Sequence, residues 1–178
     1  MPDLIPFRDI AHLFSDFDHT AWRLEAQRGY ASDRSSPKRQ RYLRGESLGF
    51  DPQHPWHANV RRQTERGKRV ERVRIVDDPP TEDQRFLLAS GLGNVEAGED
   101  IRNLYRAEAL QHGLPENDFW LFDSRLLVAF HFDDDGTTLG VEVSEEPAVV
   151  LRGCQVRDAA WHHAVRTQDF QARVRSAV

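Results

Sequence analysis

The stretch Asp118-Phe119-Trp120-Leu121-Phe122-Asp123, followed by the run RLLVAFHF at residues 125–132, is the most apolar part of the chain. Acidic and turn-forming residues bound both runs, a pattern typical of buried strands. The sequence Asp-Asp-Asp-Gly at residues 133–136 favours a hairpin turn, because Asp-Gly suits positive φ. Residues 138–143 then return as a third strand, so this region predicts a three-stranded meander.

Two further strands are predicted upstream, at residues 19–25 and 70–76, because apolar and charged residues alternate in both. The apolar side chains that share one face of these strands are Trp22, Leu24, Val73 and Ile75. The charged side chains on the opposite face are Arg23, Glu25, Arg72 and Arg74. We expect a sheet with one apolar face and one charged face.

Helices are predicted around these strands. In the N-terminal part they cover residues 7–14, 37–44 and 56–66, and Thr81 is a predicted N-cap with acids in the first turn. We expect the helix after Thr81 to end near residue 90, where Gly-Leu-Gly-Asn interrupts it. A short strand at 100–104 and a short helix at 105–112 follow. A C-terminal helical segment opens at residue 147, breaks near Gly153 and extends toward residue 173.

These elements predict an α+β fold, a mixed β-sheet with packed helices in which a strand–helix–strand unit precedes a β-meander. With 178 residues the chain is expected to form a single domain. Within it we distinguish an N-terminal helical and basic part (about 1–67), a sheet core (about 68–144) and a C-terminal helical segment (about 146–175).

Composition excludes several classes of protein. The chain is 30% charged, and no stretch approaches the roughly 20 apolar residues of a membrane span. Its first residues lack the basic and apolar regions of a signal peptide. Cys154 is the single cysteine, which rules out an internal disulfide or a cysteine-rich zinc site. We therefore expect a cytoplasmic protein that does not contact a membrane.

Charge is distributed unevenly along the chain. Residues 1–76 carry 15 lysines and arginines against 10 acidic residues, a net charge of +5, whereas residues 77–178 carry 9 against 19, a net charge of −10. The basic excess lies in two runs, residues 34–44 and 61–74. Such runs can follow phosphates, but a sequence pI of 5.9 is low for a nucleic-acid-binding domain. We rank direct nucleic-acid binding last.

Familiar catalytic and cofactor motifs are missing from the sequence. There is no phosphate-binding loop, no HExxH zinc motif and no Gly-x-Ser-x-Gly nucleophile elbow. The glycines at 91, 93 and 98 do not have the spacing of a dinucleotide fingerprint, and the acidic run at 133–136 lacks the glutamate that completes an EF-hand. We therefore assign no catalytic residue, no cofactor and no metal site.

The strongest polar candidates are charged side chains of the predicted strands. The ligand-binding candidates are Arg23, Glu25, Arg72, Arg74, Glu99, Asp100, Arg102, Asp123 and Arg125. If the strands are neighbours, these charges must pair or meet a ligand, because an unpaired buried charge is costly. Two interpretations stay open, an internal salt-bridge network and a pocket in which arginines hold a phosphate or carboxylate.

Five segments carry a family resemblance: FDHTAWRLE (17–25), RVERVRIV (69–76) with Pro80-Thr81, NVEAGEDIR (94–102), DFWLFD (118–123) and RDAAW (157–161). Over residues 14–165 the chain resembles an uncharacterised actinobacterial family of domains of unknown function. Members of that family are often encoded beside helix-turn-helix regulators. The resemblance therefore implies a regulatory or partner-binding role and brings no activity with it.

A weaker similarity links the chain to phospholipase-D-like domains. It rests on the strand–helix–strand unit followed by a DFWLFD-type hairpin. The catalytic phospholipase pattern is His-x-Lys with a later aspartate, whereas the nearest match here is His131-Phe132-Asp133, without the lysine. This similarity implies a degenerate, non-hydrolytic site.

Together these observations predict a non-catalytic accessory or regulatory binding module. It would act through a protein partner, a helix-turn-helix transcription regulator, or through an anionic small ligand, and a homo-oligomer stays open. The alternative is an unrecognised enzyme that cleaves or transfers phosphodiesters. In that case His19 or His131 would act as acid or base, and nearby acids and arginines would steady the phosphate.

Overall fold

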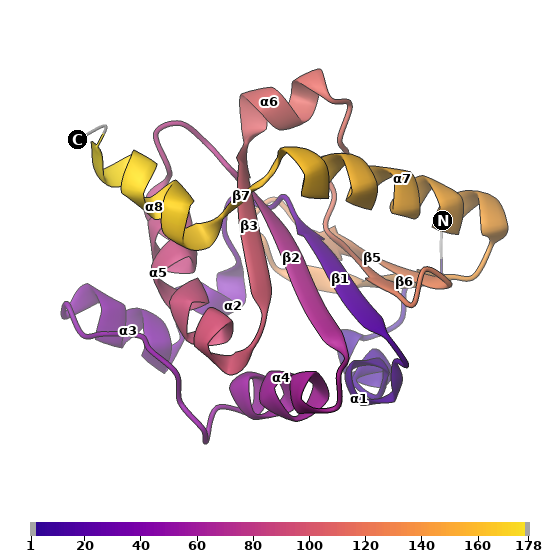
Figure 1. The fold of residues 1–178 in the computed structure, drawn as a ribbon, viewed down its shortest axis with the longest axis horizontal. Coiled ribbons are helices and arrows are strands. Elements are labelled where there is room, and N and C mark those ends of the chain that lie inside the picture. Colours follow the sequence, from indigo (N-terminus) through magenta and orange to yellow (C-terminus); the bar gives the residue numbers. More distant parts are fainter. Residues whose placement is uncertain (1–2, 177–178) are drawn as a thin grey trace.

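A computed structural model describes residues 3–176 and confirms the predicted α+β fold, a mixed β-sheet with packed helices (Figure 1). The seven-stranded sheet has the order β6-β5-β4-β1-β2-β3-β7. Its parallel half contains β1 (Thr20–Glu25), β2 (Arg69–Val76) and β3 (Asp100–Tyr105). Its antiparallel half is the predicted meander of β4 (Phe119–Phe122), β5 (Leu126–Phe132) and β6 (Thr138–Ser144). The short strand β7 (Val165–Arg166) pairs antiparallel with β3 at the other edge.

Helices cover both faces of this sheet. One face packs against α6 (Arg106–Gln111) and α7 (Pro147–His163), which lies across the strands in Figure 1. The helical segments of the other face are η1 (Phe7–Ile10), α1 (Leu13–Asp16), α2 (Ala31–Arg34), α3 (Pro37–Leu43), α4 (Pro55–Glu65) and α5 (Glu82–Ala97). The last helix, α8 (Thr167–Ser176), packs its Phe170 against Val76 and Leu88.

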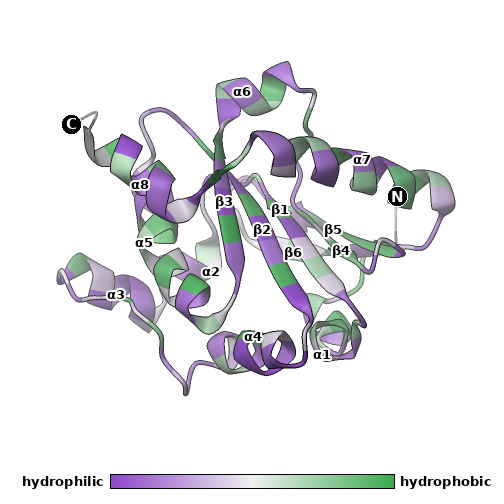
Figure 2. Cartoon of the chain, in the orientation of Figure 1, coloured by the Kyte–Doolittle hydropathy of each residue, from purple (hydrophilic) through white to green (hydrophobic). Residues whose placement is uncertain are grey.

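Alternation along the central strands divides the two faces as predicted. Figure 2 shows hydrophilic and hydrophobic residues in turn along β2 and β3. Trp22, Leu24, Val73 and Ile75 are buried in one apolar cluster with side chains of α7. The charged residues between them point to the opposite face, toward α4 and α5. Period-two alternation therefore places an apolar core and a charged surface on the same two strands.

Two predicted helix breaks are wrong, because glycine serves close packing in both helices. Helix α5 continues through Gly91 and Gly93 to Ala97. A Cβ atom at Gly93 would lie 2.8 Å from the carbonyl oxygen of Gly49, so the helix can approach that loop only without a side chain. Helix α7 is likewise continuous at Gly153, where a Cβ atom would lie 2.6 Å from Leu127 of β5.

The sheet also draws strands from outside the stretch 68–144. Strand β1 lies at its centre, between β4 and β2, and β7 lies at an edge. The N-terminal residues therefore belong to the same core as the meander. The helix predicted at 7–14 is two short helices, η1 and α1. Among the described residues, none of the helices has the length and apolar character needed to cross a lipid bilayer.

Candidate ligand-binding pocket

A lattice of buried ion pairs forms on the charged face where β1 and β2 pair. The parallel register sets Arg23 beside Arg72 and Glu25 beside Arg74. The Glu25 carboxylate lies between the three arginines. Its Oε1 accepts a hydrogen bond from Nε of Arg74 at 2.7 Å, and its Oε2 accepts one from Nη1 of Arg72 at 2.5 Å. Nε of Arg23 lies 3.7 Å from the same Oε2.

Two more carboxylates complete the lattice. Glu99, directly before β3, accepts from Nε of Arg72 at 2.7 Å and from the Trp56 indole at 3.0 Å. Asp118, directly before β4, accepts from Arg23 at 2.9 Å and from the Tyr30 hydroxyl at 2.5 Å. Three arginines thus face three carboxylates, and the lattice carries no net charge.

Asp118 also secures the chain beyond β1. Its Oδ1 accepts hydrogen bonds from the backbone amides of Ala26 and Gln27 at 2.7 and 2.9 Å. All four of its hydrogen bonds come from the segment 23–30, which leaves the carboxylate saturated. This single aspartate therefore fixes the turn that carries Tyr30 to the charged face.

Burial and neighbouring charges shift the pKa values of Glu25, Arg23 and Tyr30. Burial alone would raise the pKa of the Glu25 carboxyl, but Arg74, Arg72 and Arg23 hold it well below its usual range. Burial would lower the pKa of Arg23, and the surrounding Tyr30, Glu25 and Asp118 raise it above its ordinary value instead. Burial, followed by the charges of Glu25 and Asp118, raises the pKa of Tyr30. Glu25 is therefore ionised at every physiological pH and is a poor candidate for proton transfer.

A cavity of about 790 Å³ lies over this lattice. Its charged floor includes Arg23, Glu25, Arg72 and Arg74. Its walls are mainly aromatic, and the phenylalanine, tyrosine and tryptophan rings that line it are Phe7, Phe14, Tyr30, Trp56, Phe86, Trp120, Phe130 and Phe132. Several are in edge contact, such as Phe14 with Trp120 at 5.0 Å between ring centroids. The volume and apolar walls match those of small-molecule sites in proteins.

Some polar groups of the cavity lining lack hydrogen-bond or ion-pair partners among the residues that the structure describes. Lys38 of α3 is half-buried, and its ammonium has no hydrogen bond or ion pair within residues 3–176. Its pKa is lowered by burial; Asp33 opposes this shift and Arg72 adds to it. Trp120 is only 2% exposed, and its indole Nε1 has no hydrogen-bond partner in that same part of the chain. Nε of Arg23 and Nδ1 of His54 are likewise buried without a hydrogen-bond partner there, whereas Nε of Arg72 and Nε of Arg74 donate to Glu99 and Glu25.

The remaining predicted site residues lie elsewhere. Arg102 of β3 faces α7, with its guanidinium 3.8 Å from the centroid of the Trp161 ring, and Asp100 lies 3.5 Å from it. Asp123 accepts hydrogen bonds from the backbone amides of residues 18, 19 and 20 and so caps the start of β1. Arg125 pairs with Glu145 at the surface. Five of the nine predicted residues therefore lie together at the charged face, namely Arg23, Glu25, Arg72, Arg74 and Glu99. The other four, Asp100, Arg102, Asp123 and Arg125, lie elsewhere.

The two histidines of the enzymatic alternative are also apart from the cavity lining. His19 precedes β1, and its backbone amide donates to Asp123. His131 lies on β5, where its Nε2 is 3.5 Å from Glu142 of the edge strand β6. The histidine that does line the cavity is His54, at the start of α4. Burial, followed by the nearby His57, lowers the pKa of His54.

Sequence reasoning missed Tyr30, Lys38 and Asp118 as parts of the site. Asp118 carried a usable signal, since it directly precedes a fully apolar strand that pairs with β1. Lys38 stood out only as one of two lysines in the chain. Its place over the sheet depends on how the segment 26–54 folds back, which has no local signature.

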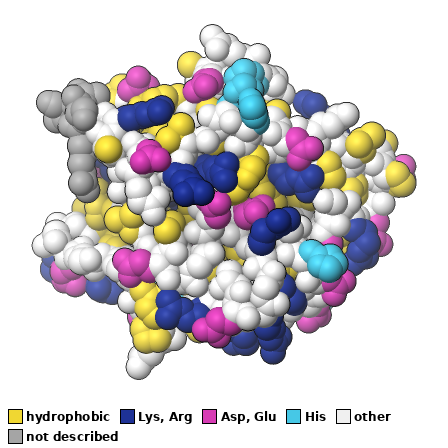
Figure 3. Space-filling view, viewed as in Figure 1, with side chains coloured by type: hydrophobic (Ala, Val, Ile, Leu, Met, Phe, Trp, Pro, Cys, Tyr) yellow, Lys and Arg dark blue, Asp and Glu magenta, His cyan; other side chains and the backbone are white. Residues whose placement is uncertain are grey.

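Arginines of the first basic run are paired with nearby acids. Arg34 and Arg39 contact Asp83 at the start of α5, and Arg41 and Arg44 contact Glu46. On the face in Figure 3, lysine and arginine side chains are interspersed with aspartate and glutamate. The arginine charges of this first basic run are thus balanced by acidic side chains that lie close to them in the folded protein.

Comparison with known proteins gives a family and a structural neighbour. Residues 8–172 match the model of a family described as "Domain of unknown function (DUF6879)". Among curated proteins, none matches the chain. Among solved structures, a phospholipase D family member, Nuc from Salmonella typhimurium, is similar with 13% sequence identity and a TM-score of 0.49, over 86% of this chain and 87% of that one.

Proposed function

For this chain, which belongs to the DUF6879 family, we propose the function of a binding module whose cavity takes an aromatic small molecule that carries an anionic group. One observation carries the proposal: an aromatic-walled cavity of about 790 Å³ contains an ammonium group, that of Lys38, without a partner in the described chain. Flat apolar walls favour a planar ligand, and a cation in a desolvated position favours an anion.

Arg72 and Arg74 of the floor are poorly placed to hold the anion. Arg74 gives Nε to Glu25 and Nη1 to the carbonyl oxygen of Leu87, and Arg72 is shared between Glu25 and Glu99. A ligand that displaced Glu25 would leave a buried carboxylate unpaired, which is costly. Lys38 has no ion pair to lose among the described residues. We therefore assign Lys38 as the group that binds the anionic part of the ligand, and the aromatic rings as the groups that contact its apolar body.

The same lattice favours binding without catalysis. A general acid or base works with a pKa near the operating pH. The carboxylate at the centre of the floor is instead held in its charged form by three arginines. This supports a receptor role over the phosphodiester-cleaving alternative.

The test uses a fluorescent aromatic anion, 8-anilinonaphthalene-1-sulfonate, and its uncharged relative N-phenyl-1-naphthylamine. Fluorescence titration of the full chain measures both dissociation constants. Lys38→Met removes the ammonium and keeps the apolar stem. We expect it to weaken the sulfonate about tenfold, the size of a lost hydrogen bond to a charged group, and to leave the uncharged probe nearly unchanged.

The chain offers a matched control in its other lysine, Lys68, which donates to the carbonyl oxygen of Phe17 and is not part of the cavity lining. Lys68→Met should leave both dissociation constants unchanged, with thermal unfolding confirming that each variant is folded. Equal weakening by both substitutions, or sulfonate binding that is insensitive to Lys38→Met, would contradict the assignment of Lys38. Failure of both probes to bind the wild-type chain would contradict the pocket itself.

We further propose that the module works in the cytoplasm with a helix-turn-helix transcription regulator as its protein partner. The support is the sequence resemblance to a family often encoded beside such regulators. Co-expression with the regulator encoded next to the gene, followed by size-exclusion chromatography, tests this directly. A complex that forms with or without the aromatic anion supports it, and separate elution under both conditions contradicts it.

A further inference from the structure

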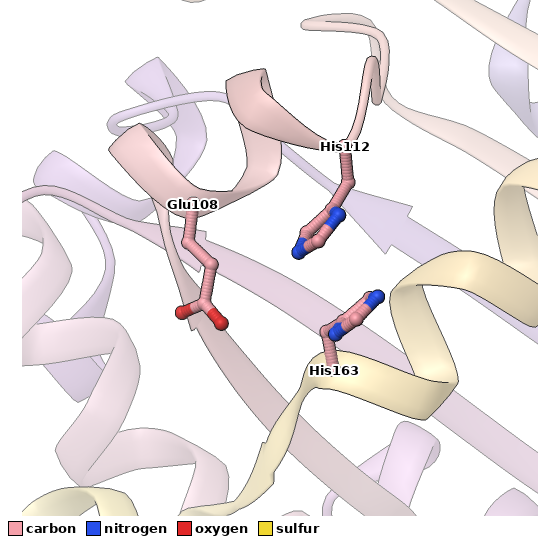
Figure 4. A group of neighbouring side chains, drawn as sticks. All are labelled: Glu108, His112 and His163. Atoms are coloured by element: carbon pink, nitrogen blue, oxygen red, sulfur yellow. The ribbon is translucent and has the colours of Figure 1, made fainter.

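Three potential metal ligands meet outside the cavity, between α6 and the end of α7 (Figure 4). They are Glu108, His112 and His163, and their ligand atoms all lie within 4.8 Å of one another. The two imidazole rings are stacked, with centroids 3.6 Å apart and an interplanar angle of 8°. Figure 3 shows histidine side chains gathered at the surface beside α6. Two elements far apart in the sequence thus contribute to one cluster.

Local geometry explains the convergence. Glu108 lies in α6 and His112 caps its C-terminus, so a spacing of four residues puts both side chains on one face. His163 is the last residue of α7, directly before the turn into β7. None of the three side chains has a hydrogen bond or a salt bridge to another group in the described chain. Their lone pairs are therefore uncommitted, unlike those of the carboxylates in the lattice.

We propose that Glu108, His112 and His163 form a binding site for a zinc-like divalent transition-metal ion. Two imidazoles and one carboxylate are a ligand set that Zn²⁺ accepts, with water in the remaining position. Calcium and magnesium prefer oxygen ligands alone and fit this set poorly.

The ligands need a modest rearrangement to close on an ion. Bonds of 2.0–2.1 Å in a tetrahedron put ligand atoms about 3.3 Å apart, so the three groups must move closer than they lie here. Glu108 and His112 are exposed and His163 is partly exposed, so rotamer changes meet little resistance. Metal binding also requires neutral imidazoles.

A bound ion would connect two parts of the fold. Helix α6 follows β3 directly, and the end of α7 leads into β7, which pairs with β3. An ion held by both helices would fasten this edge of the sheet. Because the ion binds the folded state, it would raise the unfolding temperature, and the rise would grow with the logarithm of the ion concentration once this exceeds the dissociation constant.

The experiment uses the full chain without an affinity tag, stripped of metal with a chelator. Isothermal titration with Zn²⁺ measures stoichiometry and affinity, and NMR of the histidine ring nitrogens shows which of the eight histidines respond. We expect one ion per chain and shifts at His112 and His163. His163→Ala and Glu108→Gln should each weaken binding at least about tenfold.

His12→Ala is the matched control, since this exposed histidine lies beside α1 and outside the cluster. It should bind Zn²⁺ like the wild type, and all three variants should unfold at the wild-type temperature without metal because they alter surface side chains. Equal affinity in the wild type and in His163→Ala would overturn the site. So would the absence of saturable binding, or ring shifts confined to other histidines. None of these results bears on the aromatic cavity.

Discussion

The two faces of the central sheet are built from the same strands and are buried in different ways. On the α7 face, Trp22, Leu24, Val73 and Ile75 pack in a continuous apolar cluster. On the α5 face, alternate residues of the same strands form the ion-pair lattice under the cavity. An apolar face gains stability from every contact that removes water. The charged face must first offset the cost of removing water from six ionised groups.

The two faces also differ in whether they leave room for a ligand. A close-packed apolar face leaves no room for a ligand, whereas the lattice supports a rigid floor with open space above it. Buried ion pairs contribute little net stability compared with apolar residues of similar volume, but breaking one leaves an uncompensated charge. The charged face is therefore expected to be more sensitive to single polar substitutions, and the apolar face more tolerant of small changes in shape.

The largest expected effect is that of Glu25→Gln. This substitution keeps the size of the side chain and removes the charge that two buried arginines and Arg23 share. We expect the free energy of unfolding to fall by about 3–5 kcal/mol, the range for breaking a buried ion pair. Urea denaturation followed by circular dichroism measures it.

The control is an ion pair of the same chemistry at the surface. Arg125 and Glu145 are 2.7 Å apart, and both side chains are more than 60% exposed. Arg125→Gln should change the free energy of unfolding by less than about 1 kcal/mol. If the two substitutions lowered the free energy of unfolding by the same amount, the buried ion pairs would not be more sensitive to substitution than an exposed one.

The lattice also predicts that the free energy of unfolding depends on pH in the acidic range. The pKa of Glu25 is lower in the folded chain than its ordinary value of 4.5, so its contribution to stability is complete above that value and is lost as the pH falls below it. The difference in unfolding free energy between the wild type and Glu25→Gln should therefore narrow as the pH is lowered through 4.5. Denaturation curves at a series of pH values test this, and a constant difference would contradict it.

The strands and their alternation could be predicted from the sequence, and much else could not. Arg23, Glu25, Arg72 and Arg74 were placed on one face by a period of two, which is a local property. Lys38 belongs to the long segment between β1 and β2, and its position in the cavity lining depends on tertiary packing. The helix breaks expected at the α5 and α7 glycines were wrong for the same reason. Local propensity disfavours glycine in a helix, but close contact with a neighbouring element can require it.

Gly93→Ala tests how tightly α5 covers the charged face. The added Cβ atom would lie 2.8 Å from the Gly49 carbonyl oxygen and 2.9 Å from the His57 ring. The backbone cannot move away as a flexible side chain can. We therefore expect the free energy of unfolding to fall by about 1–3 kcal/mol, a range typical of overpacking. Ser90→Ala in the same helix is the control and should cost much less. A stabilised Gly93→Ala variant would show that helix propensity outweighs the close approach.

The smallest expected effect belongs to the apolar face. Ile75→Val removes one buried methylene from the cluster beneath α7 and leaves no polar group without a partner. We expect the free energy of unfolding to fall by about 0.5–1.5 kcal/mol. The affinity for the aromatic sulfonate should not change, because Ile75 does not line the cavity. The same denaturation and fluorescence titrations measure both quantities. A loss as large as that of Glu25→Gln would remove the proposed difference between the faces, because it would show that the apolar side is equally intolerant. A change in ligand affinity alone would show instead that packing under the sheet sets the shape of the cavity above it.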